Sequence, residues 1–330
     1  MKKSKTVLSL LLVMLLSLGL TACGGNNSAQ PSDSPESSAA ETTPAVSEAT
    51  TNTVTDELGR EVTIPENPQK VLALTSAVMQ ALYNIEVEPV GKVEEFKVTE
   101  EGIALPSVGQ SQEINIESVY ALNPDLIIAS SRFHAALEEE LEQSGAVVYY
   151  FDPDKVGDIP LVELTAYIGK LLAKEDIAAQ YVESVYAVAD ELKQKVAEEA
   201  GVKTGIIIQD GDTIAAAQSA SSYGSMLSLL GIENIVPEDL PNAKKASFVP
   251  FDVETIIASN PDVIFIMTSS KDTENNKAIM EKYKNDPQWS SLDAVKNNRL
   301  LILPFSVNPN RSTPQDMVKA TAEAILKSTK

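Results

Sequence analysis

A helix–turn–strand pattern occurs twice in this chain, at residues 116–130 and at residues 253–267, with a constant offset of 137 positions. Each copy has an acidic residue followed by Ser or Thr, a short helix with one apolar face, the tripeptide Asn-Pro-Asp and an apolar run. Because a residue before proline avoids the helical region, the helices are expected to stop near Asn123 and Asn260. The apolar runs are typical of strands in a parallel sheet that is covered on both faces. We therefore expect an α/β fold with two similar lobes.

A single long helix is predicted between the two copies. Residues 175–200 contain no Gly or Pro, and Gly201 follows as a C-terminal stop. Their apolar side chains recur every three or four positions, which places them on one helix face. These residues are Ile177, Tyr181, Val185, Val188, Leu192 and Val196. At 1.5 Å per residue the helix would be about 39 Å long, enough to join two lobes.

The N-terminus has the features of a secretion signal. Lys2, Lys3 and Lys5 precede an apolar segment at residues 7–20, which is too short to span a bilayer. The sequence Leu-Thr-Ala-Cys that follows resembles the bacterial lipoprotein signal, so residues 1–22 are expected to be removed and Cys23 to be lipidated. A plain secretory signal with an incidental cysteine is the alternative.

The folded part of the chain is expected to begin after a tether. Residues 23–53 are rich in Ser, Thr, Ala, Pro and Glu and cannot bury enough apolar surface to fold, so we expect a disordered tether. The remaining boundaries follow from the helix and the repeat: an N-terminal α/β lobe at 54–173, the interlobe helix at 174–200 and a C-terminal α/β lobe at 201–330. Other expected elements include a hairpin at 54–64, strands at 87–90 and 213–217, and helices at 222–230 and 277–284.

Composition argues against several functions. A net charge of −21 and a pI near 4.4 exclude the basic surface that nucleic acid requires. The single Cys excludes disulfides and cysteine metal clusters, and the single histidine, His134, excludes a multi-histidine metal site. The sequence around His134 has no catalytic-triad signature, and no Gly-rich phosphate loop is present. We therefore expect a binding protein without a cofactor and not an enzyme.

Ligands of open α/β sheets bind beyond the carboxyl ends of the strands. Five loops follow predicted strands and would surround one cleft if the two lobes faced each other. They are residues 75–79, 131–134, 219–223, 268–270 and 305–311, and they are rich in aromatic and hydroxyl groups.

The chain resembles ABC-transporter substrate-binding lipoproteins of the iron-siderophore, haem and cobalamin class. The matching segments are residues 56–65, 89–91, 108–109, 115–128, 248–266 and 289–299. The resemblance implies two lobes bridged by one long helix. It also implies a monomer that is lipid-anchored on the extracytoplasmic face of the cell membrane, that binds a metal chelate and that has a permease and its ATPase as partners.

The resemblance also implies functional residues. Such proteins dock on the permease through one glutamate at the tip of each lobe. The second-lobe position falls on Glu254, whereas the first-lobe position falls on Gln80; Glu86 or Glu117 could substitute for it. The ligand-binding candidates in the cleft loops are Met79, Arg132, Phe133, His134, Tyr223, Ser269, Phe305 and Arg311. For Met79 a place in the core, and for His134 a solvated or capping role, are the alternatives.

The nature of these side chains favours an anionic iron(III)-siderophore type of chelate, because arginine forks bind anions and aromatic rings stack on ligands. Haem or cobalamin is the alternative ligand. Haem would need an axial ligand, for which Met79, His134 and Tyr223 are the candidates. Two alternatives of another class remain, a surface lipoprotein sensor and a hydrolase.

Overall fold

The computed structural model describes residues 52–157, 159–211, 213–238, 240, 246–268 and 271–329. The predicted signal peptide, Cys23, nearly all of the predicted tether and Ser269 lie outside these ranges. Within them, no helix has both the length and the apolar character that crossing a membrane requires.

The first lobe is built on a parallel sheet with the strand order β3-β6-β7. The expected hairpin is confirmed as β1 and β2, which pair antiparallel, and the N–H of Glu57 in its turn donates to the carbonyl of Tyr150 on β7 at 3.0 Å. The elements of this lobe are β1 Asn52–Thr55, β2 Glu61–Ile64, β3 Val71–Ala73, α1 Ser76–Asn84, α2 Glu100–Ala104, β4 Gly109–Gln110, β5 Glu113–Ile114, α3 Ile116–Leu122, β6 Leu126–Ser130, α4 Ser131–His134, α5 Glu138–Glu142, β7 Val147–Phe151 and α6 Pro160–Leu171, with 3-10 turns at Ala135–Leu137 and Pro153–Lys155.

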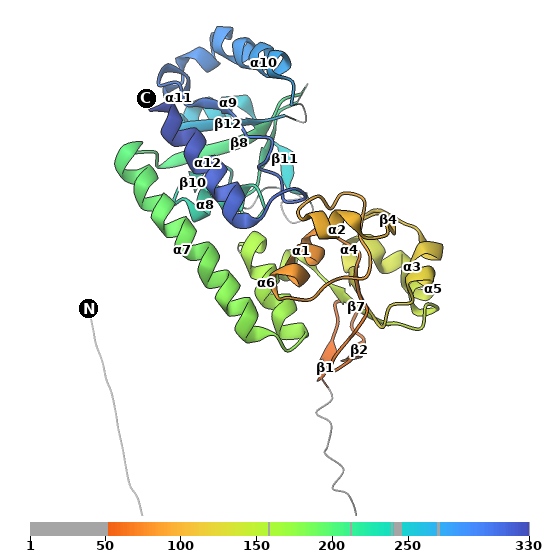
Figure 1. Ribbon diagram of the computed structural model, residues 1–330. Helices are drawn as coiled ribbons and strands as arrows, with labels where there is room; N and C mark the ends of the chain where they lie inside the picture. The colour runs from red at the N-terminus through yellow and green to blue at the C-terminus, as the bar shows by residue number, and fades with distance from the viewer. Residues whose placement is uncertain are drawn as a thin grey trace, which may run out of the picture. The chain divides into compact units, whose positions relative to one another are not determined.

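The helix that joins the lobes is confirmed as α7, Glu175–Glu199. Of the predicted stripe, Val185 and Val196 are buried and the other four residues are partly buried, while Ala178 and Ala189 beside the stripe are buried as well. In Figure 1 α7 extends from α6 of the first lobe to α12 (Pro314–Ser328) of the second, and it packs against both helices.

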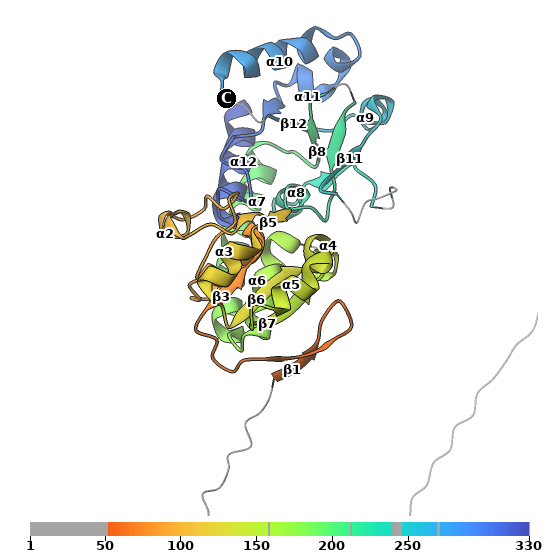
Figure 2. The ribbon, with the colours of Figure 1, turned by 90° about the vertical axis from the view of Figure 1, so that its right-hand side faces the viewer.

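The second lobe has a larger sheet whose two faces carry separate cores. The strand order is β11-β9-β8-β12-β13, with β10 also paired to β8. Alternate residues of a strand point to opposite faces, so Ile207 and Phe265 pack with α7, α8 and α12, while Ile206 and Ile264 pack with α9 and α10. Figure 2 shows this sheet lying between α12 and α9. The elements are β8 Thr204–Gln209, β9 Ala215–Ala217, α8 Gly224–Leu229, β10 Glu233–Asn234, β11 Phe248–Pro250, α9 Val253–Ser259, β12 Val263–Met267, α10 Thr273–Asn285, α11 Asp293–Lys296 and β13 Leu300–Ile302, followed by α12 and with a 3-10 turn at Trp289–Ser291.

The repeated module folds the same way in both lobes. Helices α3 and α9 end at Asn123 and Asn260, which adopt left-handed conformations with φ of 48° and 43°. The predicted stops are therefore confirmed. Asparagine suits these positions because it tolerates the left-handed region that a helix C-terminus often needs.

The aspartate of Asn-Pro-Asp has the same role in each copy. The carboxylate of Asp125 accepts hydrogen bonds from the N–H groups of residues 69 and 70 at 2.7 and 3.0 Å, just before β3. The carboxylate of Asp262 accepts from residues 203 and 204 at 2.8 and 3.0 Å, at the start of β8. Each aspartate therefore holds the amino end of the neighbouring parallel strand.

Several expected boundaries are wrong. Residues 87–90 do not form a strand, because Pro89 has no N–H for a ladder and only the N–H of Val90 reaches the carbonyl of Val71. Helix α8 starts two residues later than expected, since residues 219–223 form turns. Helix α10 starts earlier, because Asp272 caps it by accepting from the N–H of Glu274.

Candidate ligand site and docking surfaces

The carboxyl end of β6 presents a cation and an aromatic ring. Arg132 and Phe133 lie on the short helix α4, and 40% of Phe133 is exposed, which is unusual for so large an apolar side chain in this protein. The guanidinium carbon of Arg132 is 6.0 Å from the centroid of the Phe133 ring. These two predicted residues therefore lie together at the surface where a sheet of this kind binds its ligand.

His134 lies beside them but is fully buried. Its Nδ1 accepts the N–H of Ser130 at 2.9 Å, and its Nε2 is 2.7 Å from the carbonyl oxygen of Ser111. Because a carbonyl only accepts, the imidazole carries its proton on Nε2 and is neutral. Burial lowers the pKa of His134, and the hydrogen bond to Ser111 acts in the opposite direction. Both nitrogens are occupied, so in this structure His134, one of the three candidates for an axial ligand, is not placed to ligate haem iron. The alternative of a solvated side chain does not hold either, because the ring is buried.

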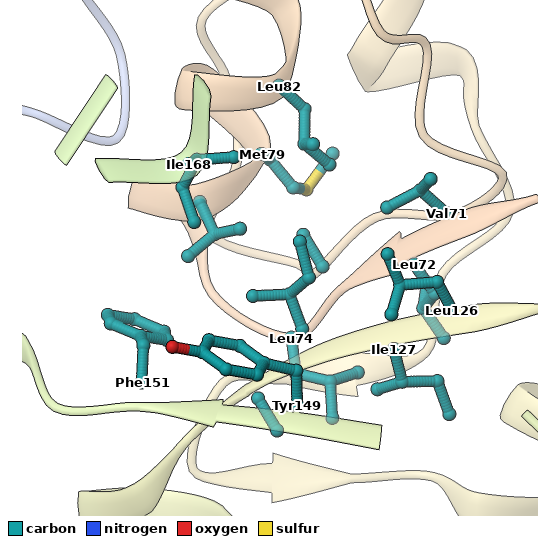
Figure 3. Close-up of a cluster of buried hydrophobic side chains, with 14 of the residues drawn as sticks. Val71, Leu72, Leu74, Met79, Leu82, Leu126, Ile127, Tyr149, Phe151 and Ile168 are labelled. Atoms are coloured by element: carbon teal, nitrogen blue, oxygen red, sulfur yellow. The ribbon is translucent and has the colours of Figure 1, made fainter. Parts of the chain in front are cut away.

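Met79 is also fully buried. Figure 3 shows it within the core of the first lobe, among Leu74, Leu82 and Ile168. It lies one turn into α1, on the face that packs against the sheet, so the core position that was the alternative is the one observed. Its sulfur is therefore not exposed to a ligand.

Tyr223 is nearly buried, with 8% of its surface exposed. It is the residue before α8, and its ring centroid is 5.2 Å from that of Phe248. Burial raises the pKa of Tyr223, so its hydroxyl stays protonated at neutral pH. The side chain packs as part of a core and offers little surface to a large ligand.

A second group of cations lies around Phe305, with Arg311 from the loop after β13 and Lys271 from the segment after β12. The guanidinium carbon of Arg311 is 5.1 Å and the Nζ of Lys271 is 4.7 Å from the centroid of the Phe305 ring. Arg311 and Phe305 were predicted, but Lys271 was missed. The signal was present in the sequence, because Lys271 directly follows the predicted loop at the end of β12. Two cations on one ring form a compact positive surface.

Gln80 does not lie at an exposed lobe tip. Only 7% of it is exposed, and its Nε2 donates to the carbonyl of Ser312 at 3.0 Å. It lines a small cavity of about 30 Å³ together with other residues of α1 and α6 and with Ser222 and Pro309 of the second lobe. The lobes meet again nearby, where the N–H of Lys97 donates to the carbonyl of Asn310 at 2.7 Å.

The two repeated helices carry exposed glutamates at matching positions. Glu254 is exposed in the first turn of α9, and Glu117 is exposed in the first turn of α3. They correspond under the offset of the repeat. Glu86 is exposed as well, but it follows α1 and has no counterpart in the second module.

No group of three or more His, Cys, Asp or Glu side chains suited to a metal ion occurs among the residues that the structure describes. The exposed candidates are instead cations and aromatic rings. This arrangement suits an anionic ligand, which arginine can hold through charge-assisted hydrogen bonds.

The profile of a family described as "Periplasmic binding protein" matches residues 71–307. Among curated proteins, the Fe(3+)-citrate-binding protein YfmC of Bacillus subtilis (strain 168) is 25% identical over 297 residues, which cover 88% of this chain and 86% of that protein. The high-affinity heme uptake system protein IsdE of Staphylococcus aureus is 21% identical over 255 residues, which cover 76% of this chain and 85% of that protein. Among solved structures, the siderophore binding protein FhuD of Vibrio cholerae with bound Fe3+-Desferal has a TM-score of 0.62 and 18% identity, covering 78% of this chain and 98% of that one. This last similarity concerns the fold.

Proposed function

The chain belongs to the periplasmic binding protein family, and we propose that it is the substrate-binding lipoprotein of an ABC importer for an anionic iron(III) chelate. The family works outside the cytoplasm. The protein would capture the chelate between its lobes and deliver it to the permease, whose ATPase drives import.

The observation that carries this proposal is the pair of cations on Phe305. In a chain with a net charge of −21, Lys271 and Arg311 gather on one ring, and Arg132 sits beside exposed Phe133. Local positive charge in a strongly acidic protein selects anions and repels cationic chelates. The printed name of YfmC, an Fe(3+)-citrate-binding protein, agrees with a ligand of this charge.

Haem is the second candidate, since IsdE is named for heme uptake. It would need an axial ligand from the protein. Met79 is in the core and both nitrogens of His134 are engaged, so Tyr223 is the remaining predicted candidate, and it too is largely buried. The side-chain positions therefore support a chelate held by charge over one held by an iron–protein bond.

We place the anchor at Cys23 and the permease contacts at Glu254 and Glu117. The two glutamates are exposed, and the repeat puts them at equivalent places in the two lobes. Permease arginines would pair with them. Gln80, which the resemblance pointed to, is less suited to this role because its side chain is buried against Ser312.

The test measures the binding of ferric citrate, cationic ferric desferrioxamine and haem to the protein. Binding is measured by calorimetry and by the change in melting temperature. Ferric citrate at 100 times its Kd should stabilise the protein by about 2.7 kcal/mol. Lys271→Ala and Arg311→Ala should each weaken ferric citrate binding about tenfold, since charge-assisted hydrogen bonds contribute about 1.5–3 kcal/mol. Lys327→Ala is the matched control, because Lys327 pairs with Glu323 at the end of α12. Equal losses in all three variants, or a preference for the cationic chelate, would contradict the proposal.

A further inference from the structure

The loop that carries Arg311 is held from the opposite lobe on both sides of that residue. The carbonyl of Asn310 accepts from the backbone N–H of Lys97 at 2.7 Å. The carbonyl of Ser312 accepts from Nε2 of Gln80 at 3.0 Å. Both donors belong to the first lobe and both acceptors to the second. The first lobe therefore fixes the backbone on each side of Arg311.

The donors are attached to rigid parts of the first lobe. Lys97 follows Phe96, which is fully buried and stacks on Tyr83 with ring centroids 5.8 Å apart. Gln80 lies in the middle of α1, a helix whose N-terminus is capped by Thr75. The positions of both donor groups are therefore determined by the core of the first lobe.

The loop is also braced internally. The carbonyl of Asn308 accepts from the N–H groups of Arg311 and Ser312 at 2.9 and 3.0 Å, and its Oδ1 accepts from the N–H of Asn310 at 2.9 Å. The segment from 308 to 312 therefore moves as a unit. A change in the lobe arrangement would shift this unit and, with it, the guanidinium that lies on Phe305.

We propose that Gln80 and the amide of Lys97 form an interlobe clamp that positions Arg311 for an anionic ligand. This inference rests on the proposed function and adds Gln80 to it as a positioning residue. Ligand affinity and lobe arrangement are then coupled, and the coupling is reciprocal: a ligand on Arg311 stabilises the clamp as much as the clamp favours the ligand.

The decisive variant is Gln80→Glu. It keeps the size of the side chain but replaces the N–H donor with a carboxylate that faces the carbonyl of Ser312, so the clamp should be lost. If position 80 instead contacted a permease arginine, glutamate would preserve or improve transport. Gln80→Met removes the donor without adding a charge and serves if the glutamate variant fails to fold. Gln315→Ala is the matched control, because Gln315 bonds Tyr181 and Ser184 of α7 and not the Arg311 loop.

Two measurements test the clamp. The hydrogen-exchange rate of the Lys97 amide reports directly on the clamp in the ligand-free full chain. Calorimetry with ferric citrate measures the effect of the clamp on binding affinity. In the Gln80 variants, Lys97 exchange should accelerate at least tenfold and ferric citrate should bind about tenfold more weakly, with Gln315→Ala near wild type. Unchanged Lys97 exchange, or unchanged affinity in Gln80→Glu, would overturn the clamp. If the wild type bound no anionic ferric chelate while Lys97 exchange still responded to Gln80→Glu, the proposed ligand would be wrong and the clamp would stand.

Discussion

The buried imidazole of His134 makes stability depend on pH in a way that one substitution can isolate. It is the only histidine of the chain, it is fully buried, and it accepts from Ser130 and donates to Ser111. Protonation would place a second N–H on Nδ1, directly against the N–H of Ser130. The folded protein therefore favours the neutral ring, in agreement with the lowered pKa that burial causes.

The sign follows from linkage. In the unfolded chain the ring has an ordinary pKa of about 6.5, so it binds a proton as the pH falls below that value while the folded protein does not. Its contribution to stability is thus complete above pH 6.5 and is lost as the pH falls toward the folded pKa. The limiting slope is about 1.4 kcal/mol per pH unit. Between pH 7.5 and pH 5.5 the loss can reach about 1.4 kcal/mol.

The assay compares wild type with His134→Gln by urea unfolding at both pH values. At pH 7.5 the variant should be about 1–3 kcal/mol less stable, since a buried hydrogen-bonding partner is lost. At pH 5.5 the difference between the two proteins should shrink by up to about 1.4 kcal/mol, because only wild type has lost the histidine contribution. Carboxylates titrate in both proteins and cancel. A difference that does not change with pH would refute the neutral, buried imidazole.

Three further predictions concern the anchor, docking and the ligand. Cys23→Ala should release the protein into the soluble fraction on fractionation; a variant that stays with membranes would contradict the lipoprotein assignment. Glu254→Arg and Glu117→Arg should each abolish iron uptake in cells while calorimetry shows nearly unchanged chelate affinity, and an equal fall in both would mean that these residues serve the ligand. Arg132→Ala should weaken ferric citrate binding at least about tenfold, because one charge-assisted hydrogen bond is lost. A haem-coloured protein whose Soret band is unaffected by Arg132→Ala would favour haem.

The sequence predicts those parts of the fold that local chemistry determines. Asn123 and Asn260 mark helix ends because proline follows each of them, and the long helix α7 follows from uninterrupted 3.6-residue periodicity. The failed strand at residues 87–90 shows the limit. Val87 and Val90 are partly buried, but Pro89 between them has no N–H to donate, so no continuous ladder forms.

The candidate site was less predictable because it depends on contacts distant in sequence. The partner of His134 is a backbone carbonyl at Ser111, which no residue pattern reveals. Gln80 is separated from Ser312 by most of the folded chain, so a comparison of motif positions could not show that its amide is occupied. Phe133 and Arg311 could be named as candidates from the sequence because the loops after parallel strands are where such sheets generally bind ligands, and both lie in loops of this kind.

The aspartates of the two Asn-Pro-Asp turns give the two ends of the parallel strands different roles. Asp125 and Asp262 accept hydrogen bonds from backbone N–H groups at the amino ends of β3 and β8. Strand register is therefore fixed at the amino ends, which bear no candidate ligand residue. The candidate ligand residues Arg132 and Phe133 lie instead at the opposite, carboxyl end of β6. Ligand preference in such a scaffold is therefore separable from strand register, and substituting Arg132 and Phe133 at the carboxyl end of β6 should change what is captured while the sheet that presents them stays the same.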